Sequence, residues 1–321
     1  MALIKGILGT LILGGGLFLF LHSRTVTIPG PLSETVSMET VATSSAAMAV
    51  LPLPEAEASS TKTQAYVPPS GHDLPPQAQL QNPPIVVKGI YVSGWTAGSD
   101  TRMTSLINLV KRTELNAMVI DIKDYSGFLS YAADIPLAHA IGAERELRIA
   151  RPNALIKRLH DNGIYVIARV TVFQDPILSK VHPEWALQKN VSGTIPWTDN
   201  KGLGWMDPAG KPTWDYAVAV SKDALARGFD EVNFDYIRFA SDGDLGGIKY
   251  PFWDKKTSRH KVIAQFFNYL RARLGDARIS ADLFGLATIN RDDLGIGQVI
   301  EDAYAAFDDV APMTYPSHYA S

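Results

Sequence analysis

The chain has 321 residues, of which 46% are hydrophobic and 20% are charged, and its net charge is −3. This composition suits a globular domain with one large core, and a charge so close to neutral gives no sign of a nucleic-acid partner. Because the sequence contains no cysteine, it excludes disulfides, thiolate metal sites and a cysteine nucleophile.

The N-terminal segment, residues 1–22, is short and apolar. One lysine, Lys5, precedes an uncharged run from Ile7 to Leu21. Such a run is typical of a signal peptide or of a single membrane-anchor helix, and no small-x-small cleavage site follows it. We therefore expect an N-terminal hydrophobic helix that contacts the membrane. It would leave the rest of the chain outside the cytoplasm, either membrane-anchored or secreted.

Residues 23–84 have a different composition. Pro, Ser, Thr, Ala and Gln dominate, proline doublets recur, and no apolar period persists. Proline-dense segments of this kind are extended and cannot bury a core. The sequence therefore predicts a disordered linker between the N-terminal segment and a globular domain at residues 85–321.

Residues 85–321 alternate strand-like and helix-like segments. Apolar runs predict strands at residues 86–93, 117–123, 165–173, 231–239, 278–284 and 309–315. Amphipathic stretches predict helices at residues 102–113, 153–162, 214–227, 260–274 and 298–306. Gly163 and Gly228 follow two of these helices, and glycine is common just after the C-terminal end of a helix. Strands that alternate with helices predict a parallel α/β sheet.

Two parallel architectures fit this pattern. A doubly wound open sheet begins with a glycine-rich turn, but Gly89, Gly94 and Gly98 do not form G-x-G-x-x-G. Polar residues near the C-terminal ends of apolar strands favour a (β/α)8 TIM barrel. Six predicted strands precede Ser321, so we expect a barrel truncated after about six strands, with an unusual open barrel as the alternative.

The segment from Glu231 to Phe239, EVNFDYIRF, is the most informative of the predicted strands. It is mostly apolar, yet it carries Asp235 in the middle and Arg238 near its end. An unpaired charge is costly to bury, so a carboxylate in such a strand is paired, neutralised or functional. In a TIM barrel, Asp235 would lie near the C-terminal end of its strand, where barrel enzymes hold their catalytic residues.

A second carboxylate, Asp282, lies near the end of the next predicted strand. Glycoside hydrolysis uses two carboxyl groups, about 5–5.5 Å apart for retention and about 6.5–9.5 Å for inversion. Adjacent strands lie about 4.8 Å apart, so this pair can reach the shorter distance. We assign Asp235 as the nucleophile and Asp282 as the acid/base. The alternative for each is a helix cap or an ion pair with no catalytic role.

Other polar and aromatic residues lie at or beyond the strand ends. Asp121 and Lys123 are two positions apart on one predicted strand, so their side chains should point to the same face of the sheet. Asp121 and Arg169 could instead form an ion pair that braces the barrel floor, and Lys123 could also be structural. The predicted substrate-binding residues are Asp121, Lys123, Arg169, Arg238, Trp205 and Tyr315. Aromatic faces can stack on sugar rings, although many such side chains fill the core instead.

Several segments together resemble a known family, the glycoside-hydrolase-like domain DUF4015. They are VIDIKDYSGFLSY (119–131), HPEWAL (182–187), WMDP (205–208), EVNFDYIRFASDGD (231–244), ISADLFG (279–285) and APMTYPSHY (311–319). The resemblance implies a TIM barrel of the glycosidase type, in bacterial proteins that are often exported. It also implies that FDYIRF and SADLFG line the site.

We therefore expect a glycoside hydrolase that acts on an extracellular or cell-envelope polysaccharide by a two-carboxylate, preferably retaining, mechanism. The alternative is a non-catalytic carbohydrate-binding barrel that helps envelope assembly. We expect no cofactor and no metal, because the sequence holds no phosphate loop and no H-E-x-x-H motif. The expected partners are a polysaccharide or oligosaccharide substrate and, through the N-terminal helix, the membrane.

Overall fold

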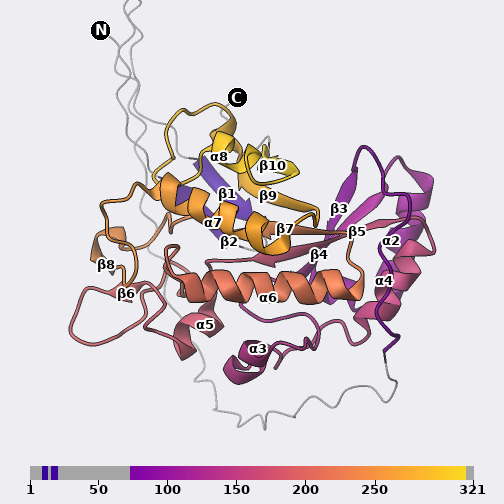
Figure 1. Cartoon of the computed structure of the whole chain (residues 1–321), viewed down its shortest axis with the longest axis horizontal. Coiled ribbons are helices and arrows are strands. Elements are labelled where there is room, and N and C mark those ends of the chain that lie inside the picture. Colours follow the sequence, from indigo (N-terminus) through magenta and orange to yellow (C-terminus); the bar gives the residue numbers. More distant parts are fainter. Residues whose placement is uncertain (1–8, 14–15, 21–72, 316–321) are drawn as a thin grey trace, which may run out of the picture. The chain divides into compact units, whose positions relative to one another are not determined.

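The computed structural model describes residues 9–13, 16–20 and 73–315 (Figure 1). Two compact units divide the chain, and residues 66–314 form the larger one. Among the residues described, no helix is both long enough and apolar enough to span a bilayer. The predicted linker lies largely outside the described residues.

The described parts of the N-terminal segment are strands, which differs from the expected helix. β1 (Gly9–Leu13) and β2 (Gly16–Phe20) pair antiparallel, with Leu13 opposite Gly16. Two glycines, Gly14 and Gly15, separate them in the sequence. Glycine weakens a helix, so this sequence is a poor helix former. The role of this segment as a signal or an anchor stays a prediction.

The larger unit is built on one parallel sheet that curls into a half-barrel (Figure 1). Its six strands follow the order of the sequence, and every neighbouring pair is parallel. They are β3 (Gly89–Val92), β4 (Ala117–Lys123), β5 (Tyr165–Thr171), β7 (Glu231–Asp235), β9 (Ile279–Phe284) and β10 (Asp309–Met313). The sequence-based prediction of a TIM-type barrel with about six strands is confirmed.

Helices connect these strands, as expected for parallel strands. The long ones are α2 (Asp100–Arg112), α4 (Pro152–His160), α6 (Lys211–Arg227) and α7 (Arg259–Leu274), and Figure 1 shows α6 and α7 alongside the sheet. The shorter ones are α1 (Gly94–Ala97), α3 (Pro136–Ile141), α5 (Pro176–Val181) and α8 (Ile300–Tyr304). β6 (Gln188–Lys189) and β8 (Ile248–Lys249) pair antiparallel outside the main sheet.

Aromatic side chains fill the space between the sheet and α7. Phe234 of β7 lies against Phe307, and Phe307 against Phe267 of α7, with ring centroids 6.1 and 4.9 Å apart. Phe234, Phe266 and Phe267 are fully buried. Burying side chains of this size stabilises the fold by about 1.5–3 kcal/mol each, so this layer holds β7 in place.

Residues 73–80, which we name the strap, belong to the larger unit, although the sequence assigned them to the linker. The Asp73 carboxylate accepts the backbone N–H groups of Asn153 and Ala154, at 2.8 and 3.0 Å, and so caps α4. At the other end of the strap, the backbone N–H of Leu80 donates to Asp230 at 2.7 Å. The folded domain therefore begins before residue 85.

Candidate active site

The carboxyl ends of four neighbouring strands bring one arginine and three aspartates together. Asp121 of β4 lies opposite Arg169 of β5 in the sheet register. In the pairing of β7 with β9, Phe234 lies opposite Ala281, and Asp235 and Asp282 are the residues that follow. The two predicted catalytic carboxylates are therefore neighbours at the same end of adjacent strands.

The Arg169 guanidinium is the centre of this cluster. Nη1 lies 2.5 Å from Asp121 Oδ1, Nη2 pairs with Asp235 Oδ2, and Nε lies 3.7 Å from Asp282 Oδ2. Burial alone would lower the pKa of Arg169, but the surrounding carboxylates outweigh it and raise that pKa. Because Asp235 and Asp282 contact one guanidinium, their near oxygens lie within the upper limit of about 9.5 Å for a glycosidase pair.

Asp235 ends β7, and a strained residue follows it. Tyr236 has φ 53°, which is unusual for a bulky side chain, and its backbone N–H donates to Asp235 Oδ1 at 2.5 Å. The prediction that this strand continues to Phe239 is wrong, because the chain leaves the sheet at Tyr236. Backbone strain of this kind clusters at functional sites, and here it orients the Asp235 carboxylate.

Asp282 lies in a setting that favours its protonated form. Burial, followed by the charge of Asp235, raises the pKa of Asp282 to about 7. Asn233 Nδ2 donates to Asp282 Oδ1 at 3.0 Å, and the side chain keeps 19% of its surface exposed. A carboxyl group that still holds its proton near neutral pH and reaches solvent is suited to general acid catalysis.

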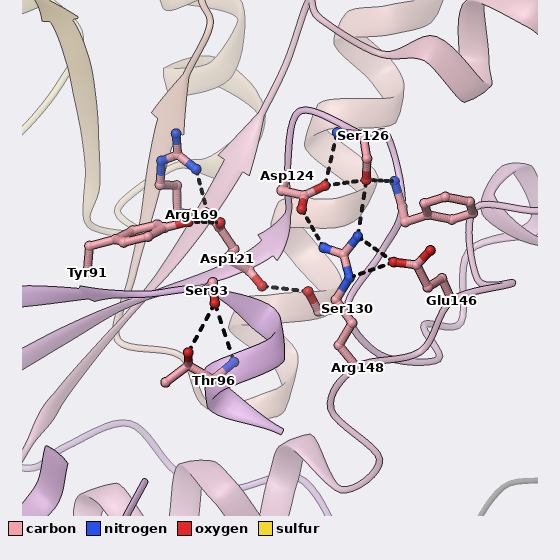
Figure 2. A network of polar contacts seen from close by, with 11 residues as sticks. Tyr91, Ser93, Thr96, Asp121, Asp124, Ser126, Ser130, Glu146, Arg148 and Arg169 are labelled. Carbon is pink, nitrogen blue, oxygen red and sulfur yellow. Dashed lines mark hydrogen bonds and ion pairs between the residues drawn. The ribbon is translucent and has the colours of Figure 1, made fainter. Parts of the chain in front are cut away.

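Asp121 lies deeper than the other two carboxylates and is held by two partners. Arg169 pairs with one of its oxygens, and the Tyr91 hydroxyl donates to the other (Figure 2). Burial raises the pKa of Asp121, and Arg169 offsets part of that rise. With a side chain only 3% exposed, Asp121 braces Arg169 rather than contacting a substrate.

Lys123 does not line the site, contrary to its predicted role in substrate binding. Its side chain is buried, with Nζ 2.8 Å from Asp175 Oδ2 and 2.9 Å from the Thr171 carbonyl oxygen. The sheet register shifts between Asp121 and Lys123, so the equal parity that predicted a common direction does not hold. Such a bulge redirects side chains, and here Lys123 pairs internally.

Arg238 and Trp205 are also too deeply buried to contact a substrate, which corrects their predicted role. The Arg238 guanidinium lies over the Trp205 ring, 4.8 Å from its centroid, and donates to the Phe239 carbonyl oxygen at 3.1 Å. Trp205 Nε1 donates to Asp199 at 3.0 Å, and its side chain is 1% exposed. Arg238 therefore ties the segment that follows β7 to the buried Trp205.

Tyr315 follows β10 and has an exposed side chain. Its part in substrate binding stays a prediction. Among residues 73–315 no group of histidine or acidic side chains has an arrangement that could hold a metal ion.

Two residues of the cluster were missed from the sequence. Asn233 precedes Asp235 by two positions, so their common parity in EVNFD could have identified it. Tyr91 lies in an apolar strand, and its hydroxyl has no sequence signal that separates it from a core tyrosine. Its contact with Asp121 depends on the pairing of β3 with β4.

Comparisons with known proteins identify the family of this chain and its fold. Residues 89–321 match the family described as "putative glycosyl hydrolase domain", DUF4015. A crystal structure of a hypothetical protein from Ruminiclostridium thermocellum is 37% identical, with a TM-score of 0.55, over 64% of this chain and 98% of that one. The PgaB (BpsB) glycoside hydrolase domain from Bordetella bronchiseptica is 14% identical, with a TM-score of 0.52, over 71% and 74% of the two chains.

The chain therefore belongs to the DUF4015 glycosyl hydrolase domain family. The similarity to the Bordetella domain shows a common fold alone, because the identity is low. No curated protein matches the chain in sequence.

Proposed function

We propose that this protein is a retaining glycoside hydrolase that cleaves an extracellular or cell-envelope polysaccharide. The observation that carries the proposal is the pairing of Asp235 and Asp282, at the same end of adjacent strands and on one guanidinium. The family and the glycoside hydrolase fold support it. The N-terminal apolar run supports export of the domain.

The two carboxyl groups have different roles in the proposed reaction. Asp282, with its raised pKa, donates its proton to the glycosidic oxygen as the bond from that oxygen to the anomeric carbon breaks. Asp235 attacks the anomeric carbon and forms a glycosyl ester. Asp282, now a carboxylate, takes a proton from water, and the resulting hydroxide displaces Asp235 and restores both groups.

Arg169 and its partners orient the pair. Arg169 reaches Asp235 with one nitrogen while Asp121 binds another, so the guanidinium cannot rotate freely. Asn233 holds one oxygen of Asp282 and leaves the other near Arg169. A side-chain geometry fixed before the substrate arrives lowers the barrier, because no reorganisation is needed in the transition state.

The test compares the protein with Asp235→Asn on peptidoglycan, chitin, cellulose, β-1,3-glucan and α-1,4-glucan. We expect the protein to release reducing ends from at least one glycan, and Asp235→Asn to lose at least about 10³-fold of that rate while still binding the glycan. Binding by the parent without release of reducing ends from any glycan would favour the non-catalytic carbohydrate-binding barrel.

A further inference from the structure

An exposed tryptophan lies at the start of α1, directly after β3. The side chain of Trp95 is 58% exposed, and all six tryptophans of the chain lie in its described part. The other five are buried or half-buried. A single exposed apolar side chain is ordinary, so a binding role for Trp95 depends on what supports and surrounds it.

Trp95 is held against a buried and fully paired cation. The Arg148 guanidinium lies 5.3 Å from the centroid of the Trp95 ring. As Figure 2 shows, Arg148 is bound in turn by Asp124, Ser126 and Glu146, with its Nη2 atom 3.2 Å from the hydroxyl of Ser126 and 3.0 Å from the carboxylate of Glu146. Its side chain is only 3% exposed. The indole therefore has a rigid support on one side while much of its surface faces solvent.

This aromatic support is connected to the candidate active site. A Cβ at Gly94, the residue before Trp95, would lie 2.3 Å from Ser130 Oγ and 3.1 Å from Arg148 Cδ, so only glycine allows this close approach. The Ser130 hydroxyl donates to the Asp121 carbonyl oxygen at 2.6 Å (Figure 2). Asp121 in turn binds Arg169, which holds the catalytic pair.

Two further exposed aromatic side chains lie on the same strand ends. Tyr91 of β3 is 60% exposed. The central carbon of the Arg169 guanidinium lies 5.6 Å from the centroid of the Tyr91 ring. Tyr125 follows β4 and is also exposed. We define the aromatic platform as Tyr91, Trp95 and Tyr125. It occupies the β3 and β4 ends of the sheet, whereas the catalytic carboxylates occupy the β7 and β9 ends.

We propose that the aromatic platform binds sugar units of the substrate from the cleaved bond outward, with Tyr91 beside Arg169 and Trp95 as the main stacking residue farther along the sugar chain. Along the sheet, β3 and β7 are three strand spacings apart, roughly 14 Å, so the ring on Trp95 is not the ring that is cleaved. The substrate is therefore a chain of several sugars and not a disaccharide. This inference rests on the proposed function for the position of the cleaved bond.

The test measures binding in the Asp235→Asn background, so that no turnover interferes. The probes are cello-, chito-, laminari- and malto-oligosaccharides of two to six units, titrated by calorimetry. We expect at least one series to bind more tightly with length. Trp95→Ala should weaken hexamer binding about tenfold and leave dimer binding unchanged, whereas Trp95→Tyr should retain most of the affinity.

Tyr304→Ala is the matched control, because Tyr304 is 63% exposed at the end of α8 and shortly precedes the amino end of β10. It should leave every affinity unchanged. Equal affinities for Trp95→Ala and its parent, or no binding of any series, would overturn the proposal. Length-dependent binding through Trp95 without hydrolysis by the wild-type protein would overturn the catalytic function and leave the platform standing.

Discussion

The two ends of the parallel sheet both bury carboxylates but surround them differently. At the amino end, Glu231 accepts from Ser280 and from Tyr165, the latter at 3.1 Å, and lies 3.6 Å from Arg278. At the carboxyl end, Asp121, Asp235 and Asp282 share Arg169 as a common cation. An excess of carboxylates over cations raises the free energy of the ionised cluster. The fold tolerates this at the end where the proposed chemistry occurs.

The largest expected effect is the loss of hydrolysis when Asp235, at the carboxyl end of β7, is neutralised. Neutralising Glu231, at the amino end of the same strand, is the comparison. Asp235→Asn should lower the rate of hydrolysis by at least about 10³-fold, because it removes the proposed nucleophile. Glu231→Gln, the matched control four residues earlier, should keep the rate within a few-fold. The assay is the release of reducing ends from the glycan that we expect the wild-type protein to cleave. Equal losses in the two variants would mean that Asp235 has no special role.

The next largest effect concerns the two arginines. Arg169→Met leaves three carboxylates without their cation and should reduce the free energy of unfolding by about 3–5 kcal/mol at pH 8. The loss should be smaller at pH 5, because Asp121 and Asp282 have raised pKa values and take up protons first. Urea unfolding at the two pH values measures both.

Arg278→Met is the control for this loss at the amino end. Arg278 pairs with Asp309 at 2.8 Å, and its side chain is 37% exposed. Exposed ion pairs contribute about 0–1 kcal/mol, and Glu231 keeps its hydrogen bonds from Ser280 and Tyr165, so this variant should lose less than Arg169→Met. A larger loss for Arg278→Met than for Arg169→Met would contradict the contrast between the two ends.

A moderate effect is expected from Asp282 and depends on pH. Burial and Asp235 raise the pKa of Asp282 to about 7 from 3.8, so the native state keeps a proton that the unfolded state has lost between these values. The stability due to that proton is complete below pH 3.8 and is lost as the pH rises through about 7. Asp282→Asn should therefore raise the unfolding free energy on the order of 1–4 kcal/mol at pH 8 and very little at pH 4. Thermal unfolding of both proteins at the two pH values provides the check, and a pH-independent difference would refute it.

The smallest effect is expected from the strap, whose contacts are with α4 and Asp230. Asp73→Ala removes the cap of α4 and should cost about 1 kcal/mol of stability, with hydrolysis unchanged. Asp73→Asn keeps a capping oxygen and should recover most of the loss. An unchanged stability for Asp73→Ala would mean that the strap does not belong to the folded domain.

The sequence predicted the strands and the closeness of Asp235 and Asp282 because both depend on local patterns. Apolar runs located β4, β5 and β7, and the polar residues at their ends identified Asp235 and Arg169. The wrong predictions came from effects with no local signal. The bulge that redirects Lys123 and the positive φ at Tyr236 depend on pairing and packing between segments far apart in the chain. The burial of Trp205 depends on the same long-range packing.

The most direct test of the account is the titration of the Asp282 carboxyl carbon by 13C NMR, in the wild-type protein and in Asp235→Asn. The account predicts a midpoint near the raised pKa of about 7 in the wild-type protein. It predicts a clearly lower midpoint in Asp235→Asn, because the neighbouring negative charge is gone. A midpoint near that of an ordinary aspartate in both proteins would contradict the assignment of Asp235 and Asp282 as a catalytic pair.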